Sequence, residues 1–380
     1  MINISVPYLT GNEKKYLNEC IKENHVSAVG KFISKFENKF KKIYKYNCAA
    51  ALNSGTSALH LSLKALGVKK NDLMILPSYT FAATANAILY CQAEPWFFDI
   101  SSDNLTIDLN KVEKTLNNKT YIKKNICYLK KTKQVIRGII PVFTFGLSPD
   151  LEKLEKLSKK YHLKVLLDGA AAHGSTFKNK MISKFNFTTC YSFNGNKTFT
   201  CGGGGIIATN NNKIFNKIKI LSNIGKRKNS YKYTEVGFNY KINNIQAAIG
   251  LAQLEKFKKI LNRKKKIFLR YTKSFSNIKK IAIPKKQYWQ NGVPWTFFYL
   301  LKNIKNVKKN FNYLNKANIE SKYFWIPLHL QRPYSKFMSE DMKFTNFFWK
   351  RTIVLPSSSG ISINLQRKII NKVKKFLGEI

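Results

Sequence analysis

Short apolar runs alternate with helical patterns through the first half of this chain, and this alternation restricts its fold more than any other feature. Apolar runs at 48–52, 73–76, 96–99, 135–142 and 164–168 predict strands, with amphipathic segments between them. Such an order predicts crossover connections and a mostly parallel sheet with helices on both faces, an α/β fold. Ligands of such sheets bind where strands end, so the turns after strands are the expected location of the chemistry.

The second half of the chain has a different texture. A long helical pattern begins near Asn243 and continues past Arg270. A strand at 295–301 and helices at 305–317 and 366–377 are expected after it. A chain of 380 residues is long enough for two domains. We therefore expect a large domain at 1–255, which includes the N-terminal helices, and a smaller C-terminal α/β domain at 256–380.

The chain is strongly basic, with 67 Lys and Arg against 20 acidic residues and a formal net charge of +47. Such a charge attracts nucleic acid, membranes and anionic small molecules. The cations are mostly lysines spread along the whole chain, whereas nucleic-acid proteins concentrate arginine and aromatic residues on one face. A compositional bias is therefore the preferred explanation, and no specific nucleic-acid partner is expected. Polyanion binding remains the alternative.

Cysteine usage and the N-terminal sequence indicate a cytoplasmic protein. The six cysteines form no CxxC pair, which favours reduced thiols and gives no sign of a metal site. The N-terminus has no basic start followed by an apolar stretch, so no signal peptide is expected. Residues 73–93 lack charges for long enough to suggest a membrane span. They include Pro77 and several polar residues, so a strand, a loop and a helix explain them better.

One local feature combines a lysine with glycines. A predicted strand ends in Lys197, and four glycines follow at 202–205. Successive glycines let the backbone turn tightly and approach a ligand closely. A lysine held there can be desolvated and lose its proton more easily, as a Schiff-base amine requires. The alternative is a surface lysine in a glycine loop, which is common in a chain so rich in lysine.

Three further turns follow predicted strands. Asp168 closes an apolar run, and pyridoxal phosphate enzymes use such a carboxylate to keep the pyridine nitrogen protonated. The turn at 53–57 leads into a helix whose free N–H groups can bind an anion. Phe81, in the next such turn, can stack on a planar cofactor. Helix capping explains the first two features equally well, and core packing explains Phe81.

The order and spacing of these features resemble the DegT/DnrJ/StrS family of sugar-nucleotide aminotransferases. These are pyridoxal phosphate enzymes of fold type I, with a large cofactor-binding domain and a smaller C-terminal domain. The resemblance covers nearly the whole chain, and the block at 236–254 is among its most specific parts. The matching blocks are 52–59, 77–87, 168–174, 192–205, 236–254 and 327–334.

The resemblance implies a role for each matching residue. Lys197 matches the lysine that holds pyridoxal 5'-phosphate as an internal aldimine and then shuttles a proton. Asp168 matches the partner of the pyridine nitrogen. The expected catalytic residues are thus Lys197 and Asp168, and no metal is expected. The expected cofactor-binding residues are Gly55, Thr56, Ser57, Phe81, Asp168, Ser192, Lys197 and Asn239.

Asn239 matches a residue that reaches the cofactor phosphate of a neighbouring subunit, so the resemblance implies a homodimer with shared active sites. Lys241, Arg332 and His329 are candidates for contacts with substrate. Two positions depart from the family pattern. Ala171 stands where the family often has a polar residue near the ring hydroxyl. Lys241 stands where the family usually has arginine, which removes a bidentate donor.

The N-terminal blocks 5–13 and 25–30, with 192–197, resemble the subgroup of the bacillosamine and legionaminic acid pathways. This implies transfer of the amino group of glutamate, by way of pyridoxamine phosphate, to C4 of a UDP-linked 4-keto-6-deoxy-N-acetylhexosamine. The product would serve a bacterial surface glycan. Three alternatives remain open: another nucleotide keto-sugar, a dehydratase or deoxygenase of the same fold, and a non-catalytic regulatory or polyanion-binding protein. The intact Lys197 argues against the relatives that replace this lysine with histidine.

Overall fold

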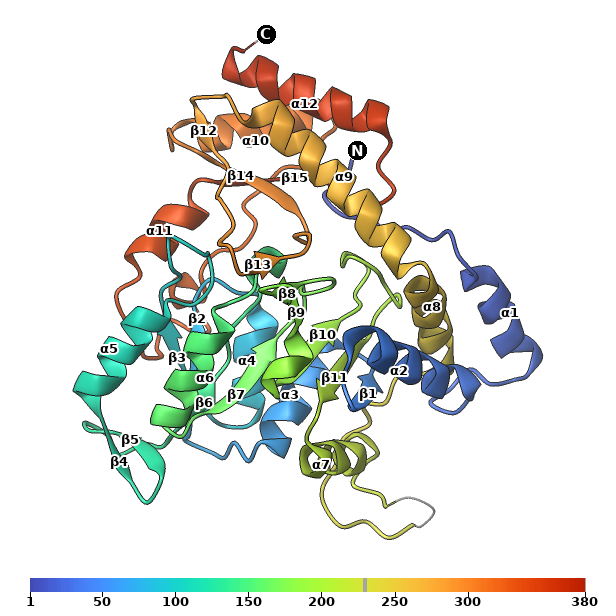
Figure 1. The fold of residues 1–380 in the computed structure, drawn as a ribbon, viewed down its shortest axis with the longest axis vertical. Coiled ribbons are helices and arrows are strands. Elements are labelled where there is room, and N and C mark those ends of the chain that lie inside the picture. Colours follow the sequence, from blue (N-terminus) through green and yellow to red (C-terminus); the bar gives the residue numbers. More distant parts are fainter. Residues whose placement is uncertain (228–230, 380) are drawn as a thin grey trace.

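The computed structural model describes residues 1–227 and 231–379. Its centre is a seven-stranded sheet of order β1-β11-β10-β7-β6-β2-β3 (Figure 1). Strand β11 runs antiparallel to both of its neighbours, and the other strands run parallel to one another. The prediction of a mostly parallel sheet is therefore confirmed. The strands are β1 (Cys48–Leu52), β2 (Leu73–Pro77), β3 (Glu94–Phe98), β6 (Ile136–Ile139), β7 (Lys164–Asp168), β10 (Thr188–Ser192) and β11 (Gly205–Thr209).

Helices cover both faces of this sheet. Successive side chains of a buried strand point to opposite faces, so both faces present apolar side chains that a layer of helices buries. In β1, Ala49 and Ala51 belong to one core, whereas Ala50 and Leu52 belong to the other. The first face packs against α2 (Lys31–Tyr44), α5 (Leu109–Lys119), α6 (Leu151–Lys160) and α8 (Asn244–Glu255). The second face packs against α3 (Gly55–Ala65), α4 (Ala82–Tyr90) and α7 (Asn212–Ser222). Helix α1 (Glu13–Lys22) lies beside α8 at the rim (Figure 1).

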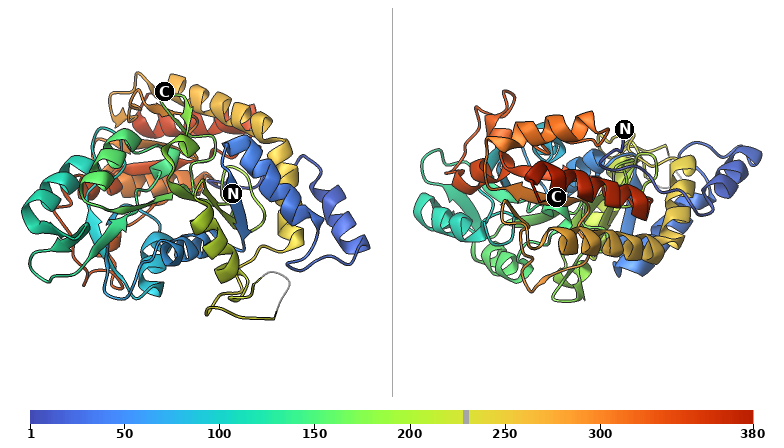
Figure 2. Two further views of the ribbon diagram at one scale, coloured as in Figure 1. Left: turned by 60° about the horizontal axis from the view of Figure 1, so that its bottom comes forward. Right: turned by 90° about the horizontal axis from the view of Figure 1, so that it is seen from above.

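The C-terminal unit has its own antiparallel sheet of order β12-β14-β15 and its own core. Tyr271, Phe297 and Ile353 are buried in that core. Figure 2 shows this unit as a layer of helices lying against one end of the large sheet. Its elements are α9 (Phe257–Phe275), β12 (Ile281–Ala282), β14 (Phe297–Leu301), α10 (Asn306–Lys316), β15 (Thr352–Leu355) and α12 (Ile363–Leu377).

The expectation of one long helix from Asn243 past Arg270 is wrong. Helix α8 ends at Glu255 and α9 begins at Phe257. The start of α9 still packs in the core of the large sheet, through Phe257, whereas its later turns pack in the C-terminal core. A break in the chain direction lets both contacts form. It falls beside the predicted domain boundary, which stays a prediction.

Two segments cross that predicted boundary. Ile2 pairs with Ile319, so the N-terminus joins the C-terminal unit. Leu328 and Met342 pack in the core beneath α4, and Phe97 of β3 pairs with Ser339. Residues 228–230 and 380 fall within the two predicted domain ranges and lie outside the described residues.

The remaining elements are short connections between these layers. Residues 73–93, the uncharged stretch, form β2, a turn, α4 and the bend after it. In the described part of the chain no helix is long and apolar enough to cross a membrane. The short elements are β4 (Thr120–Lys123), β5 (Ile126–Leu129), β8 (Thr176–Phe177), β9 (Lys180–Met181), β13 (Gln290–Asn291) and α11 (Lys343–Trp349), with single 3₁₀ turns at Thr144–Gly146, Ile182–Phe185 and Leu328–Leu330.

Candidate active site

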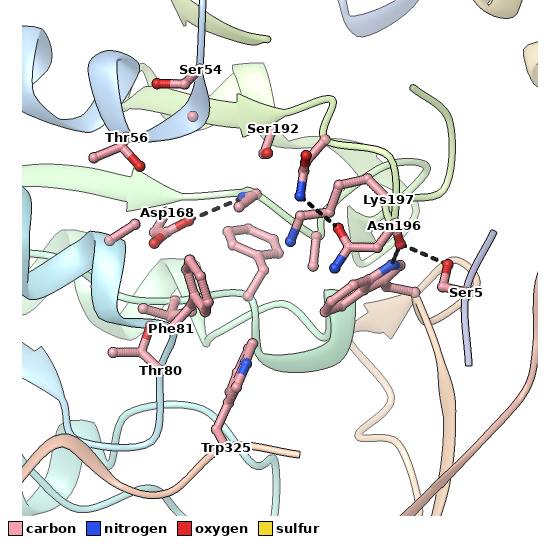
Figure 3. A pocket seen from close by; sticks show the side chains of 18 of the residues that line it. Ser5, Ser54, Thr56, Thr80, Phe81, Asp168, Ser192, Asn196, Lys197 and Trp325 are labelled. Carbon is pink, nitrogen blue, oxygen red and sulfur yellow. Dashed lines mark hydrogen bonds between the residues drawn. The ribbon is translucent and has the colours of Figure 1, made fainter. Parts of the chain in front are cut away.

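A cavity of about 500 Å³ lies where strands β1, β7 and β10 end. The turns after these strands and after β2 form its inner walls, as expected for a parallel sheet. Its outer walls come from the N-terminal residues Ile4 and Ser5 and from the segment 320–325. Figure 3 shows the side chains of Asp168, Ser192 and Lys197 around this space.

Lys197 lies in a turn beyond the end of β10, where its backbone N–H group donates to the backbone carbonyl of Asn194 at 2.9 Å. The expectation that a strand ends in Lys197 is wrong, because β10 ends at Ser192. The lysine Nζ atom lies 4.0 Å from the centre of the Trp295 ring. Burial lowers the pKa of Lys197 to about 8, and the charge of Asp168 opposes this shift. The amine is therefore easier to deprotonate than an ordinary lysine.

Asp168 is buried at the end of β7 and faces the same cavity. Thr84 Oγ1 donates to its Oδ2 atom at 2.7 Å, and the Ala170 N–H group donates to Oδ1 at 3.1 Å. Burial raises the pKa of Asp168, while both donors and the nearby Lys197 oppose this effect. The two fixed hydrogen bonds hold the carboxylate in one orientation toward the cavity.

The start of α3 forms the opposite end of the cavity. Ser54 caps this helix, and its hydroxyl accepts the Ser57 N–H group at 3.0 Å. The backbone N–H groups of Gly55 and Thr56 belong to the first turn, so they have no acceptor within the helix. Gly55, Thr56 and Ser192 line the cavity. Ser57 is buried behind it and donates to Asn53 Oδ1 at 2.6 Å, so its side chain fixes the turn.

The Ser192 wall is held by a histidine to which the sequence analysis gave no role. His173 Nε2 lies 2.8 Å from Ser192 O, and Nδ1 lies 2.9 Å from Tyr44 Oη. Burial lowers the pKa of His173 to about 3, so the ring is neutral at physiological pH. A neutral ring donates from one nitrogen and accepts at the other, as these two partners require. Nε2–H therefore donates to the Ser192 carbonyl and Nδ1 accepts from Tyr44.

Aromatic side chains form much of the remaining wall. Phe81 is 61% exposed, although it is large and apolar, because it projects into the cavity. Trp325 of the C-terminal unit points into the cavity (Figure 3), and its neighbour Phe324 also lines it. Ala171 also lines the cavity. The two tryptophans and Ser5 could not be predicted as site residues, because they lie outside the turns that follow the strands and reach the cavity from other segments of the chain.

Besides Ser57, four predicted residues are not on the cavity wall of this chain. Asn239 and Lys241 are exposed, and the Asn239 carbonyl accepts from Asn53 Nδ2 at 3.3 Å. His329 is half-buried against Ser78 Oγ at 2.6 Å, and Arg332 is exposed. Their assigned roles therefore stay predictions.

The cavity has a cation that the sequence analysis did not identify. Of the described residues that line it, Lys197 and Lys322 carry cationic side chains. Lys322 Nζ pairs with Glu320 Oε1 at 2.6 Å, and the Ile4 N–H group donates to Glu320 Oε2 at 2.9 Å. A lysine at this position gives no local signal in so basic a chain.

Known proteins share this architecture. The chain is 32% identical to GDP-perosamine synthase of Vibrio cholerae over 99% of both chains. It is also 32% identical to UDP-4-amino-4,6-dideoxy-N-acetyl-beta-L-altrosamine transaminase of Campylobacter jejuni serotype O:23/36, over 72% of this chain and 70% of the relative. The Helicobacter pylori aminotransferase PseC, described as involved in the biosynthesis of pseudoaminic acid, superposes with a TM-score of 0.88 at 25% identity over 99% of both chains.

A family-wide sequence model gives the same result over almost the full length. The model of the DegT/DnrJ/EryC1/StrS aminotransferase family matches residues 7–374. The match includes both halves of the molecule and each loop that lines the inner cavity. The resemblance found in the sequence is thus confirmed, and the chain belongs to the DegT/DnrJ/EryC1/StrS family of pyridoxal-phosphate-dependent sugar aminotransferases.

Proposed function

We propose that this chain is a cytoplasmic, homodimeric enzyme that transfers the amino group of glutamate to C4 of a UDP-linked 4-keto-6-deoxy-N-acetylhexosamine. The observation that carries the proposal is the arrangement of one cavity. A deprotonatable lysine, a buried carboxylate and a helix start with two free amides, those of Gly55 and Thr56, all face it. Six free, buried cysteines fit the reducing compartment.

The residues present fit pyridoxal phosphate. The helix start at Gly55 and Thr56, with the Ser192 hydroxyl, offers donors and a positive helix end to a phosphate. The approach is narrow, since a Cβ atom at Gly55 would lie 2.9 Å from Ser192 Cβ. Phe81 presents an aromatic surface to the same cavity as this end and Asp168. The site thus has a place for phosphate, ring and ring nitrogen.

Each residue has a defined task in amino transfer. When bound, pyridoxal phosphate supplies an electron sink for the carbon that loses its proton. The Lys197 amine removes that proton and returns it, and its lowered pKa of about 8 suits a base that works near neutral pH. Asp168 keeps the ring nitrogen protonated, and Thr84 holds Asp168 in place. The aromatic wall excludes water from the reacting atoms.

The outer part of the cavity is suited to anionic substrates. Glutamate and a nucleotide diphosphate sugar both carry negative charge, and Lys322, which pairs with Glu320, is a cation on the outer wall of the cavity. The large net positive charge of the chain favours their encounter. A GDP-linked 4-keto-6-deoxyhexose is the second candidate acceptor, because full-length relatives at 32% and 31% identity are named GDP-perosamine synthase.

The proposed dimer would complete the phosphate site. Asn239 is exposed, and its segment also exposes Val236 by 90% and Tyr233 by 57%. Apolar side chains with such exposure favour burial against another protein surface. The family resemblance assigns Asn239 to the phosphate site of the second subunit, and this exposure supports that assignment.

A product assay tests the proposed reaction. The holoenzyme is incubated with glutamate and either a UDP-linked 4-keto-6-deoxy-N-acetylhexosamine or a GDP-linked 4-keto-6-deoxyhexose. Mass spectrometry should detect an amino sugar from the UDP substrate, in an amount equal to the 2-oxoglutarate released. If only the GDP substrate gives an amino sugar, the acceptor is the GDP-linked sugar and not the UDP-linked one. If neither substrate is converted, the proposed reaction is wrong.

A further inference from the structure

Helix α9 buries a lysine that has no acidic partner in the described part of the chain. Lys264 is 2% exposed and lies on the apolar face of α9, between Ile260 and Ile267. No ion pair of the described residues includes it. Burial of an ammonium group without a carboxylate costs free energy, so Lys264 needs other hydrogen-bond acceptors.

The Lys264 amino group binds two backbone carbonyls from different segments. It donates to Trp295 O, just before β14, and to Ser357 O at 3.0 Å, just after β15. Burial lowers the pKa of Lys264 to about 7. The neutral amine and the ammonium both have the two N–H groups that these carbonyls need. The contact therefore survives a change in the charge of Lys264.

Trp295 connects this contact to the cavity. Its backbone N–H group donates to Phe145 O at 2.7 Å, and its indole Nε1–H group donates to Asn196 O at 2.6 Å. Asn196 is the chain neighbour of Lys197, and Figure 3 shows its carbonyl bound also by Ser5. The Trp295 ring lies 4.0 Å from Lys197 Nζ. One tryptophan thus holds the backbone beside Lys197 and covers its amine.

We propose that Lys264 is a positioning residue for Lys197: by fastening the Trp295 carbonyl from α9, it keeps the indole against the Lys197 amine and against the turn that carries it. The importance of this role rests on the proposed use of Lys197 as the reactive amine. The contacts themselves extend from α9 of the C-terminal unit to the loop after β10.

The proposal has a measurable consequence for Lys197. Burial lowers its pKa to about 8, and the Trp295 ring is part of the surface that excludes water. Asp168 is the charged group that opposes this shift, while Glu320 and Lys322 lie on the outer wall of the cavity. If the indole is released, water reaches the amine and its pKa rises toward the ordinary value of 10.5.

Competitive acetylation of the full-length apoprotein tests this consequence without relying on activity. Trace acetic anhydride labels neutral amines, and mass spectrometry of the Lys197 peptide across pH gives its titration midpoint. In Lys264→Met the midpoint should rise by about one pH unit or more, so that labelling near neutral pH falls about tenfold. Lys264→Arg retains N–H donors, so its Lys197 midpoint should stay close to that of the wild type. Lys266→Met, the same change at an exposed position of α9, should leave the midpoint unaltered.

Trp295→Phe provides the second arm of the test. It keeps a ring beside Lys197 and leaves the Lys264 side chain in place, but it lacks the donor to Asn196 O. The Lys197 midpoint should rise in this variant too, and this result decides the matter if Lys264→Met does not fold. An unchanged midpoint in a folded Lys264→Met, or in Trp295→Phe where Lys264→Met does not fold, overturns the proposal. Because the label needs no cofactor, a failure of the proposed aminotransfer would be visible separately, as the absence of an amino sugar in the product assay.

Discussion

At the scale of single residues, the site depends on buried polar groups with few but fixed partners. Asp168 could be identified from the sequence because a carboxylate directly after an apolar strand is a local signal. Lys264 was missed, although it interrupts the apolar stripe of α9 at a regular helical position. Its meaning comes from Trp295 and Ser357, which lie 31 and 93 residues away. Local patterns do not reveal such partners.

Replacement of Asp168 tests its proposed electrostatic role. Asp168→Asn keeps the size of the side chain and removes its charge, so the ring nitrogen loses its anionic partner. We expect the single-turnover rate with glutamate, followed by absorbance, to fall about 100-fold or more. Asp103→Asn, an exposed loop position, is the matched control. A rate within a factor of about two of wild type would rule out the assigned role of Asp168.

The buried His173 predicts an acid-sensitive fold. Its pKa is about 3 in the folded protein against 6.5 for an ordinary histidine, so the unfolded chain binds the proton first as the pH falls. Stability is complete above pH 6.5 and is lost below it, at about 1.4 kcal/mol per pH unit from this group. Urea unfolding across this range measures the slope. The slope should be shallower in His173→Gln, and an equal slope would show that His173 does not cause it.

At the scale of elements, the sequence predicted most strands of the large sheet but neither the reversed direction of β11 nor the end of β10. Strand direction depends on which neighbour a strand finds in the sheet, and β11 pairs with both β1 and β10. A run of apolar residues carries no such information. The predicted long helix is broken at Lys256: α8 and the first turn of α9 pack in the core of the large sheet, whereas the later turns of α9 pack in the C-terminal core. Periodicity alone does not show such a change of partner.

The junction of α3 and β10 gives a prediction at this scale. In Gly55→Ala the new methyl group would lie 2.9 Å from Ser192 Cβ, so the helix start or the strand end has to shift. We expect pyridoxal phosphate to bind about tenfold more weakly, as measured by equilibrium titration of the apoprotein. Gly195→Ala is the control, because nothing lies within 4 Å of a Cβ atom there. Equal affinities in the two variants would place the phosphate elsewhere.

At the scale of the whole molecule, the proposed dimer predicts complementation between two inactive variants. Lys197→Ala lacks the reactive amine, and Asn239→Ala lacks the residue assigned to the partner's phosphate site. After the two are mixed and allowed to exchange subunits, each heterodimer has one intact site. The mixture should regain about a quarter of wild-type activity. Light scattering should show a dimer, and a mixture that stays inactive although its subunits exchange would place Asn239 in its own subunit's site.

The central claim is that the Lys197 amine holds pyridoxal phosphate and accepts an amino group from glutamate. The visible absorption spectrum of the purified protein with pyridoxal phosphate, recorded before and after addition of glutamate, tests it most directly. We predict a band for the bound cofactor that glutamate shifts toward the spectrum of pyridoxamine phosphate, and no such band in Lys197→Ala. A wild-type protein without the band would contradict the account, and a band that glutamate leaves unchanged would contradict glutamate as the donor.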